Sequence, residues 1–421
     1  MRFVSTRGLA PSIDFPSALF EGLAPDGGLY VPERIERVPI ESLRGATLTE
    51  LGVEISRPYL GSSIATLDLS RLLNAALDFP IPTVAVGDGL SALELFHGPT
   101  FAFKDIGARV MARLMAYFNA GDQDLTVLVA TSGDTGSAVG QAFFGLDGTR
   151  VVVLFPEHGV TPVQDAQFTT LGGNVTAVAV TGSFDDCQRL AKEAFASDLR
   201  QHVRLTSANS INIGRLLPQV FYYAHAAMQI NQPLVVSVPS GNFGNLTAGL
   251  WAQRAGFRIR RFVAATTIND TVPRYLEAGR YEPRPSVPTL ANAMDVGNPS
   301  NLERIRWLFQ DNLNAMRRAL VPSVHTDDQV RHAIRQLWTH HRYLVDPHSA
   351  IAALGAMASG PSAETPHLFL ATAHPGKFRE TVEPLTGDSI ALPEPLHQAM
   401  NRPRIVERIA PTLAQLRAIL R

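Results

Sequence analysis

The sequence has little of the features that mark several classes of protein. It has one cysteine, Cys187, which excludes an internal disulfide and a multi-cysteine metal site. Its histidines show no H-E-x-x-H or Cys–His spacing, so no metal is expected. No apolar run approaches the ~18 residues of a membrane span, and residues 1–15 lack the apolar core of a secretory signal. The net charge is −1 and basic residues are scattered. We therefore expect a cytoplasmic protein that binds neither membranes nor nucleic acid.

Lysine is much scarcer than arginine. The chain has three lysines, Lys104, Lys192 and Lys377, against 34 arginines. Arginine stays protonated in proteins, whereas a desolvated lysine can lose its proton and attack a carbonyl to form a Schiff base. Lys104 is the strongest candidate for this chemistry because it lies in the apolar segment FAFKDI. The alternative is a lysine whose stem packs against apolar groups while its ammonium group reaches solvent.

Short apolar runs alternate with helical patterns from residue 125 onward. Six runs are typical of buried strands: Leu125–Ala130, Arg150–Pro156, Asn174–Val180, Pro233–Pro239, Arg260–Thr266 and His367–Ala373. These runs do not alternate with polar residues, and helical segments separate one run from the next. The pattern therefore predicts an α/β protein with parallel strands buried on both faces. The pattern of the first ninety residues, which is rich in turn signals, predicts short helices separated by turns. Residues 270–347 predict mostly helix and loop, with a proline-rich connection at residues 272–288.

One strand-to-helix loop has the composition of an anion cradle. In parallel sheets, ligands bind at the carboxyl ends of the strands. The loop PSGNFGN (residues 239–245) carries Gly241 and Gly244, which let the backbone approach a ligand. Together with the free N–H groups of the following helix start, it suits a phosphate. The alternative is a tight turn without a ligand, and the loop is neither a Walker A motif nor the G-x-G-x-x-G dinucleotide motif.

A second strand-to-helix loop, ATSGDTGS (residues 130–137), is rich in hydroxyl groups. Its polar side chains are Thr131, Ser132, Asp134, Thr135 and Ser137. Such a loop can offer donors to a carboxylate or a phosphate of a substrate. The alternative is a helix cap, since Ser, Thr and Asp all cap helices well. One cap residue would suffice, so the number of donors favours binding.

The two loops and Lys104 together indicate a cofactor that carries both a phosphate and an aldehyde. Pyridoxal phosphate is such a cofactor, and the protein would supply its position and its electrostatic surroundings. A competing interpretation from a different class is a non-enzymatic nucleotide-binding α/β module, in which residues 239–245 hold a nucleotide phosphate. That interpretation leaves Lys104 without a function.

Seven segments resemble, in order, the conserved blocks of the threonine synthase family. These segments are HGPTFAFKDIGARVM, ATSGDTGSAV, TSANSINIGRLLPQ, VSVPSGNFGNLTAGL, NDTVPR, NAMDVGNPSN and ATAHPGKF. The N-terminal segment PDGGLYVP is similar to the opening block of the family, and the resemblance runs from about Thr6 to about Lys377. No motif is identified in the last forty residues.

The resemblance implies the fold of the type II pyridoxal-phosphate enzymes. In this fold, two open parallel-sheet α/β domains hold the cofactor in the cleft between them. We expect an N-terminal helical and turn-rich extension at residues 1–90. A smaller α/β domain with Lys104 and the SGDTG loop would span residues 91–228. A larger α/β domain with the SGNFGN loop would span residues 229–421.

The resemblance also implies roles for individual residues. The implied cofactor-binding residues are Lys104, Asp134, Ser240, Gly241, Asn242, Phe243, Gly244, Asn245 and Thr372. Lys104 would form the Schiff base, and Thr372 would pair with the pyridine nitrogen. Asp134 would lie beside the phenolic oxygen, with its protonation state left open. The implied substrate-binding residues are Thr131, Ser132, Asn209, Ser210 and Arg215. The role of Lys377 is left open.

The implied reaction converts O-phospho-L-homoserine and water to L-threonine and phosphate by γ-elimination and β-addition of water. Lys104 would be both tether and base, which requires an amine with a pKa near the working pH. Desolvation by Phe101 and Phe103 would lower its pKa in that direction. The alternative is another fold-type-II lyase, either an amino-acid dehydratase or a phospho-lyase. A dehydratase substrate carries no phosphate, so it would leave the segment SANSINIGR without an anion. We expect a monomer or a homodimer.

Overall fold

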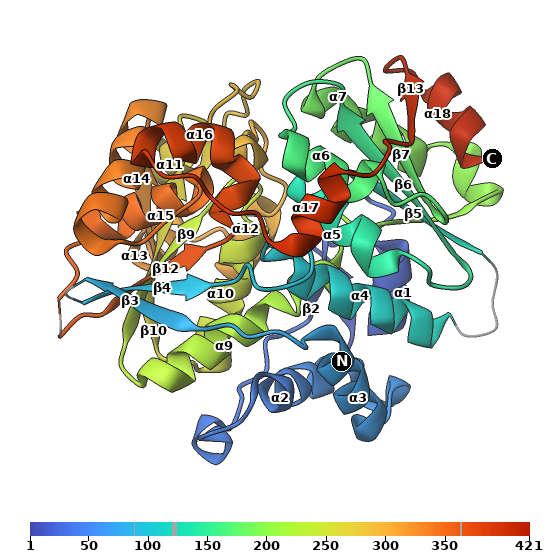
Figure 1. Cartoon of the computed structure of the whole chain (residues 1–421). Helices are drawn as coiled ribbons and strands as arrows, with labels where there is room; N and C mark the ends of the chain where they lie inside the picture. Colours follow the sequence, from blue (N-terminus) through green and yellow to red (C-terminus); the bar gives the residue numbers. More distant parts are fainter. Residues whose placement is uncertain (88, 120–123, 363) are drawn as a thin grey trace.

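Two parallel sheets form the framework of the molecule, and an N-terminal helical segment packs against the helices of both (Figure 1). The computed structural model describes residues 1–87, 89–119, 124–362 and 364–421. The predicted α/β class with parallel sheets is confirmed. Among the described residues, no helix is long and apolar enough to cross a membrane.

The larger sheet has six strands. Their order is β11 (Leu320–Val324), β10 (Ile259–Thr266), β9 (Leu234–Pro239), β12 (His367–Ala371), β4 (Leu90–Glu94) and β3 (Thr83–Gly87). All neighbours are parallel except β3 and β4. Alternate residues of β12 enter different cores: Phe369 packs with α14 (Asp327–His341) and α15 (Pro347–Ala358) on one face. Leu368 packs on the other face, in the core that contains α9 (Gln219–Ile230) and α10 (Gly244–Ala255).

The smaller sheet has five strands, all parallel. Their order is β13 (Val406–Ile409), β7 (Val175–Val180), β6 (Thr149–Pro156), β5 (Leu125–Ala130) and β8 (Arg204–Ser207). One face packs on α7 (Phe184–Ala196) and α18 (Leu413–Leu420). The other face shares its core with three further helices, α4 (Lys104–Phe118), α5 (Asp134–Phe143) and α6 (Pro162–Thr169). Both faces are therefore buried, which explains why these strands read as continuous apolar runs.

The N-terminal segment bridges the two halves of the molecule. It contains a small antiparallel pair, β1 (Phe3–Ser5) and β2 (Tyr30–Pro32), and the helices α1 (Phe15–Glu21), α2 (Leu48–Leu60) and α3 (Thr66–Ala76). Helix α2 packs on α9 beside the larger sheet, and α3 packs on α4 beside the smaller sheet. The expected short helices of this segment are present. Its position suggests that it holds the two sheets together.

The six predicted strands are all present, and their ends differ by at most two residues from the prediction. Residues 270–347 are mostly helix and loop, as expected, but the range also contains a strand that was not predicted, because β11 pairs with β10 as an edge strand. This strand is short, contains Pro322 and is buried mainly at its first residue, so its pattern is weak. The expectation of a proline-rich connection at residues 272–288 is partly wrong. Its first half forms α11 (Thr271–Ala278), where Pro273 lies in the first turn and interrupts no helical hydrogen bond.

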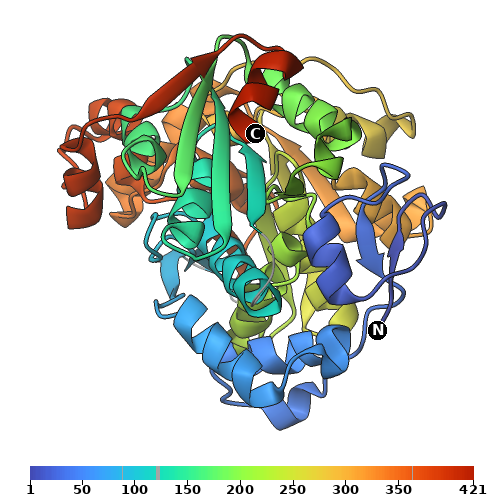
Figure 2. The ribbon, with the colours of Figure 1, turned by 90° about the vertical axis from the view of Figure 1, so that its right-hand side faces the viewer.

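The domain boundaries after residues 90 and 228 stay predictions. Sheet membership does not follow them, because β4 spans the first boundary and pairs with β12 of the larger sheet. The C-terminal strand β13 lies in the range expected for the larger domain, but it pairs with β7 of the smaller sheet (Figure 2). The last forty residues therefore complete the smaller sheet.

Candidate active site

A cavity of about 120 Å³ lies where residues that follow strands of both sheets face each other. The predicted site residues that line it are Lys104, Ser132, Asp134, Asn209, Ser210, Arg215, Gly241, Asn242, Phe243, Gly244, Asn245 and Thr372. Thr131 and Ser240 do not line it. A more open groove of about 830 Å³, between the N-terminal segment and helix α12 (Leu302–Leu308), contains none of the predicted site residues.

Lys104 is the first residue of α4, and main-chain contacts fix its position. The Phe103 N–H donates to the Thr372 carbonyl over 2.8 Å, and Ala102 forms a bridge with Ala373, so the helix start is joined to the end of β12. The Lys104 side chain is half-buried, with Nζ 5.7 Å from the centre of the Phe103 ring. Its Nζ makes no hydrogen bond or ion pair with the residues that the structure describes. Burial lowers the pKa of Lys104 to about 8.

The loop of residues 239–245 leaves its backbone donors unused. Within the described chain, no acceptor is found for the N–H groups from Gly241 to Leu246, which include the first turn of α10. A Cβ atom at Gly241 would lie 2.7 Å from Met294 Cα, so only glycine fits there. The Asn245 amide nitrogen is buried beside the cavity and has no partner in the part of the chain that the structure describes. These unpaired donors at a helix N-terminus fit the phosphate of the expected cofactor.

Two asparagines join this loop to the segment that contains Ser210. The Asn242 amide donates to Ser210 Oγ over 2.7 Å and accepts from the Ser300 N–H over 2.6 Å. The Asn301 amide donates to Ser210 Oγ over 3.3 Å and to the Asn242 carbonyl over 3.1 Å. Because Ser210 Oγ accepts both amides, its own proton remains available for a ligand in the cavity. Asn301 was not predicted as a site residue, although it closes the NAMDVGNPSN segment.

In the loop of residues 130–137, some hydroxyl groups form hydrogen bonds with the backbone of the loop itself. Thr131 Oγ1 accepts from the Gly133 N–H over 2.9 Å and from the Gly136 N–H over 2.8 Å. It also donates to the Gly133 carbonyl over 3.0 Å. The hydroxyl of Thr131 is buried and saturated, so the capping alternative describes this residue. Ser132 faces the cavity.

Asp134 is held by a lysine that lies far away in the sequence. Lys377 Nζ lies 2.7 Å from Asp134 Oδ1, and the Gln164 amide donates to the same oxygen over 2.9 Å. Burial would raise the pKa of Asp134, but the ammonium groups of Lys377 and Lys104 outweigh it and hold the pKa well below its usual range. The protonation state that the sequence left open is therefore the carboxylate.

Arg215 carries a buried charge that has no carboxylate partner among the described residues. It lies in the short helix α8 (Ile213–Leu216), where Nη1 donates to the Ala208 carbonyl over 2.5 Å. Its Nε has no partner among the residues described, and burial lowers the pKa of the guanidinium to about 10. An uncompensated buried guanidinium favours an anion in the adjacent cavity. Asn209, by contrast, uses its amide to pair with the Ala130 N–H and carbonyl, so it joins two loops.

Thr372 is braced by a cluster that sequence reasoning missed. Its N–H donates to Ser349 Oγ over 3.0 Å, and that hydroxyl donates to the buried carboxylate of Asp346. His348 Nδ1 lies 2.7 Å from Asp346 Oδ1, while His348 Nε2 accepts from the Ala293 N–H over 3.2 Å. These two contacts place a ring proton on Nδ1, and His348 lines the cavity. The DPHSA segment offered the signal, but without metal-ligand spacing it was not assigned to the site.

Comparisons with known proteins agree with this geometry. The sequence model of the threonine synthase N terminus matches residues 2–77, that of pyridoxal-phosphate dependent enzymes matches residues 85–370, and that of the threonine synthase C-terminal part matches residues 349–420. The chain is 43% identical to a threonine synthase of Haemophilus influenzae over 97% of this chain and 96% of the relative. It is 39% identical to the threonine synthase of Escherichia coli, over 100% of this chain and 99% of the relative.

Two solved structures have the same fold over the whole chain. The crystal structure of threonine synthase from Escherichia coli superposes with a TM-score of 0.95 at 39% identity, covering 100% of this chain and 99% of that chain. A crystal structure of threonine synthase with bound pyridoxal phosphate, from Brucella melitensis, gives a TM-score of 0.91 at 36% identity, covering 100% and 98%. The expected type II fold of pyridoxal-phosphate enzymes is thereby confirmed.

Proposed function

The chain belongs to the threonine synthase family of pyridoxal-phosphate-dependent enzymes, and on that premise we propose that its cavity converts O-phospho-L-homoserine and water to L-threonine and phosphate. One observation carries this proposal. A lysine with a lowered pKa, a row of unpaired N–H groups and a buried arginine without a carboxylate line the same cavity. The two anion-binding elements match two phosphates, one on the cofactor and one on the substrate.

The residues of the cavity fit pyridoxal phosphate. When bound, this cofactor supplies an aldehyde that condenses with an amine and a ring that takes up the electrons released at the substrate carbon. Lys104 would carry the cofactor, and the N–H groups from Gly241 to Asn245 would hold its phosphate. Thr372 would meet the ring nitrogen, and Asp134 would face the phenolic oxygen. The Thr372 hydroxyl makes no hydrogen bond with the described residues and lines the cavity, which supports this assignment.

Lys104 would also move the proton. An amine with a pKa of about 8 is partly neutral near neutral pH, so Nζ can take a proton from the substrate carbon and return it. An ordinary lysine, with a pKa near 10.4, would be neutral in a far smaller fraction of molecules. The centre of the Phe103 ring lies 5.7 Å from Nζ, and burial of the amine is the largest cause of its lowered pKa.

Arg215 and Ser210 would bind the phosphate of the substrate, and Ser132 would bind its carboxylate. A substrate phosphate would pair the guanidinium of Arg215, which is otherwise buried without a counter-charge. A substrate without a phosphate would leave this charge unpaired. This argument favours phosphohomoserine over the substrates of an amino-acid dehydratase. The cytoplasmic location and the monomer or homodimer remain proposals made from the sequence.

Product analysis tests the proposed function. The protein is loaded with pyridoxal phosphate, O-phospho-L-homoserine is added, and phosphate, threonine and 2-oxobutyrate are quantified together. Equal amounts of phosphate and threonine are expected. Phosphate with 2-oxobutyrate would make the protein a phospho-lyase. A loaded protein that releases no phosphate would rule out this substrate, and a protein that binds no cofactor would favour the nucleotide-binding alternative.

A further inference from the structure

We propose that Lys377 is a positioning residue of the active site: its ammonium group ties Asp134 to the peptide that precedes Lys104, and so sets the direction of the Asp134 carboxylate and the charge around Lys104. The proposal builds on the function given above, because it assumes that Lys104 and Asp134 face the cofactor. The predictions from the sequence assigned no role to Lys377.

Lys377 joins three segments that lie far apart in the sequence. It belongs to the short 3-10 helix η5 (Pro375–Phe378), which follows β12. Its Nζ lies 2.7 Å from Asp134 Oδ1 at the start of α5 and donates to the Thr100 carbonyl over 2.9 Å. Its own carbonyl accepts from Thr161 Oγ1, at the start of α6, over 3.0 Å. Lys377 is 1% exposed, so water does not replace any of these contacts.

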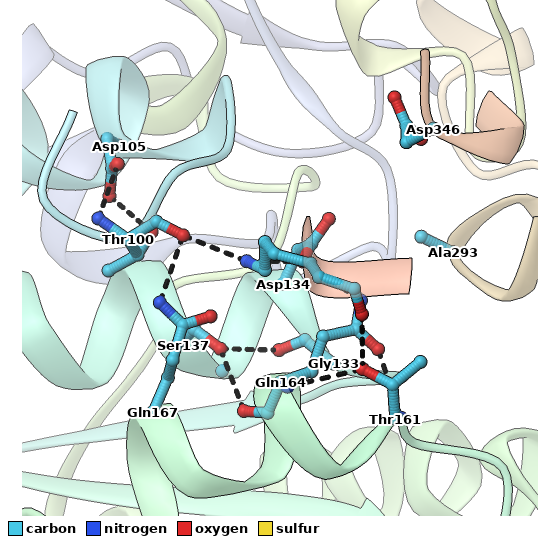
Figure 3. A network of polar contacts seen from close by, with 12 residues as sticks. Thr100, Asp105, Gly133, Asp134, Ser137, Thr161, Gln164, Gln167, Ala293 and Asp346 are labelled. Atoms are coloured by element: carbon cyan, nitrogen blue, oxygen red, sulfur yellow. Dashed lines mark hydrogen bonds and ion pairs between the residues drawn. The ribbon is translucent and has the colours of Figure 1, made fainter. Parts of the chain in front are cut away.

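The contact with Thr100 reaches the helix that begins with Lys104. The Thr100 N–H and hydroxyl donate to the buried carboxylate of Asp105, over 2.9 and 2.6 Å, and Asp105 directly follows Lys104 (Figure 3). The Gln167 amide donates to the Thr100 carbonyl over 3.0 Å (Figure 3). This carbonyl is the one that accepts from Lys377 Nζ. The carbonyl of Thr100 therefore fixes the distance between Lys377 and the start of α4.

Helix α6 braces the other side of the ion pair. Gln164 donates to Asp134 Oδ1, and its position is set by a capping box with Thr161 (Figure 3). Gly133 leaves room for this side chain, since a Cβ atom there would lie 2.5 Å from Gln164 Cδ. With Oδ1 held by both Lys377 and Gln164, the Asp134 carboxylate has one orientation at the cavity wall.

The rival explanation is an ion pair that only stabilises the fold. Burying two charges is costly, and replacing such a pair with apolar groups of similar volume is often neutral or stabilising. Stability alone therefore gives a weak reason for a charged pair at this place. The pair also lies beside a cavity that holds another ammonium group. A role in setting the charge around Lys104 makes a prediction that a purely structural role does not.

The prediction concerns the direction in which the pKa of Lys104 shifts when Lys377 or Asp134 loses its charge. Burial lowers the pKa of Lys104 most, Arg215 and Lys377 lower it further, and Asp134 and Asp346 raise it. Removing the charge of Lys377 removes a repulsion, so Lys104 should hold its proton to a higher pH. Removing the charge of Asp134 removes an attraction, so Lys104 should lose its proton at a lower pH. The two single variants should therefore shift the titration of Lys104 in opposite directions.

The scarcity of lysine makes this titration practical. The full chain, without added cofactor, is produced with lysine labelled with 13C at Cε, which gives three signals because the chain has three lysines. The signals are followed from neutral pH to about pH 11, which covers ordinary and lowered lysine pKa values. The variants are Lys377→Met, Asp134→Asn and the double variant. Lys192→Met is the matched control because Lys192 is exposed on α7, and its missing signal also completes the assignment.

We expect Lys377→Met to raise the midpoint of Lys104, and Asp134→Asn to lower it, each by about 0.5 pH unit or more. The double variant should fall between the two, and Lys377→Arg should restore part of the shift because it keeps the charge. Equal midpoints in all variants, or shifts of the same sign in both single variants, would overturn the proposal. If Lys377→Met fails to fold, the double variant, which removes both buried charges, and Asp134→Asn alone still test the sign.

The outcome separates this inference from the proposed function. The titration uses neither cofactor nor substrate, so unchanged midpoints contradict the role of Lys377 whatever product the enzyme makes. Opposite shifts in a protein that forms no threonine would contradict only the proposed reaction. Thermal unfolding of the same variants provides the structural control. Both single variants should lower Tm by several degrees because each leaves one buried charge unpaired, and the double variant should recover part of that loss.

Discussion

The two strand-to-helix loops of the cavity have similar positions, but they use their backbone N–H groups in opposite ways. One follows β5 and leads into α5, and the other follows β9 and leads into α10. In the first loop, the Thr131 hydroxyl accepts the N–H groups of Gly133 and Gly136. In the second loop, the N–H groups from Gly241 to Leu246 find no acceptor in the described parts of the chain. The first loop satisfies much of its own backbone and presents one carboxylate, while the second leaves a row of donors to a ligand.

The difference shows that a donor-rich loop is not always a binding loop. The first loop has more hydroxyl groups, and this favoured binding when only the sequence was considered. A hydroxyl that lies three residues before a helix start can accept an N–H group of the first turn, and Thr131 does so. In the second loop the N-cap residue is Phe243, whose side chain offers no acceptor, so the backbone N–H groups at the helix start stay available. The free N–H groups are therefore found where a capping side chain is lacking.

The largest effect is expected for Lys104, because the proposed function makes this one residue both the tether of the cofactor and the base. Lys104→Ala should reduce threonine formation by at least about 10³-fold, since tether and base are lost together. The rate of threonine release from O-phospho-L-homoserine measures this effect. Lys192→Ala, which removes an exposed lysine, is the matched control and should keep the normal rate. Turnover by Lys104→Ala within tenfold of normal would contradict the assignment of both loops.

Arg215 tests the proposal that the phosphate of the substrate and the phosphate of the cofactor bind at separate places. Arg215→Ala should raise KM for O-phospho-L-homoserine by about 10²-fold, because charge-assisted hydrogen bonds to the phosphate are lost. The affinity for pyridoxal phosphate should change by less than about threefold, a difference below 1 kcal/mol. Steady-state kinetics and cofactor titration give the two numbers. If cofactor affinity falls and KM does not, Arg215 serves the cofactor phosphate and the two sites have been exchanged.

Gly241 tests whether the second loop is an open cradle. Gly241→Ala places a Cβ atom 2.7 Å from Met294 Cα, so the backbone has to shift and its N–H groups lose their common direction. Cofactor affinity should fall by about tenfold, or about 1.4 kcal/mol. Fluorescence titration with pyridoxal phosphate measures this loss. Gly140→Ala is a suitable control, because the nearest atom to its Cβ would be the end of the Leu171 side chain, 3.1 Å away.

Thr131 should give the smallest effect on function and a clear effect on stability. Thr131→Val keeps the shape but removes the acceptor of two buried N–H groups, which should lower the free energy of unfolding by about 1–3 kcal/mol. Cofactor affinity and KM should each stay within about threefold. Chemical denaturation and steady-state kinetics of the same preparation test both statements. A large rise in KM with unchanged stability would show that Thr131 binds the substrate, as the sequence suggested.

Local signals in the sequence predicted the six strands β5, β6, β7, β9, β10 and β12 and most of the residues that line the cavity. The strand Leu125–Ala130 is apolar throughout because both of its faces are buried, and Lys104 is conspicuous because lysine is scarce. The edge strands β11 and β13 were missed because they are short and largely exposed. The pairing of Asp134 with Lys377 could not be predicted, since it depends on how the end of β12 meets the start of α5. The same holds for the cluster of Asp346 and His348, which becomes part of the site only through tertiary packing.

The most direct test is to identify the lysine that binds the cofactor. The protein is incubated with pyridoxal phosphate and reduced with borohydride, and its peptides are analysed by mass spectrometry. We expect the pyridoxyl group on Lys104 and an unmodified Lys192 and Lys377. A label on Lys377 or Lys192, or a protein that binds pyridoxal phosphate and carries no label, would contradict the central role of Lys104 in this site.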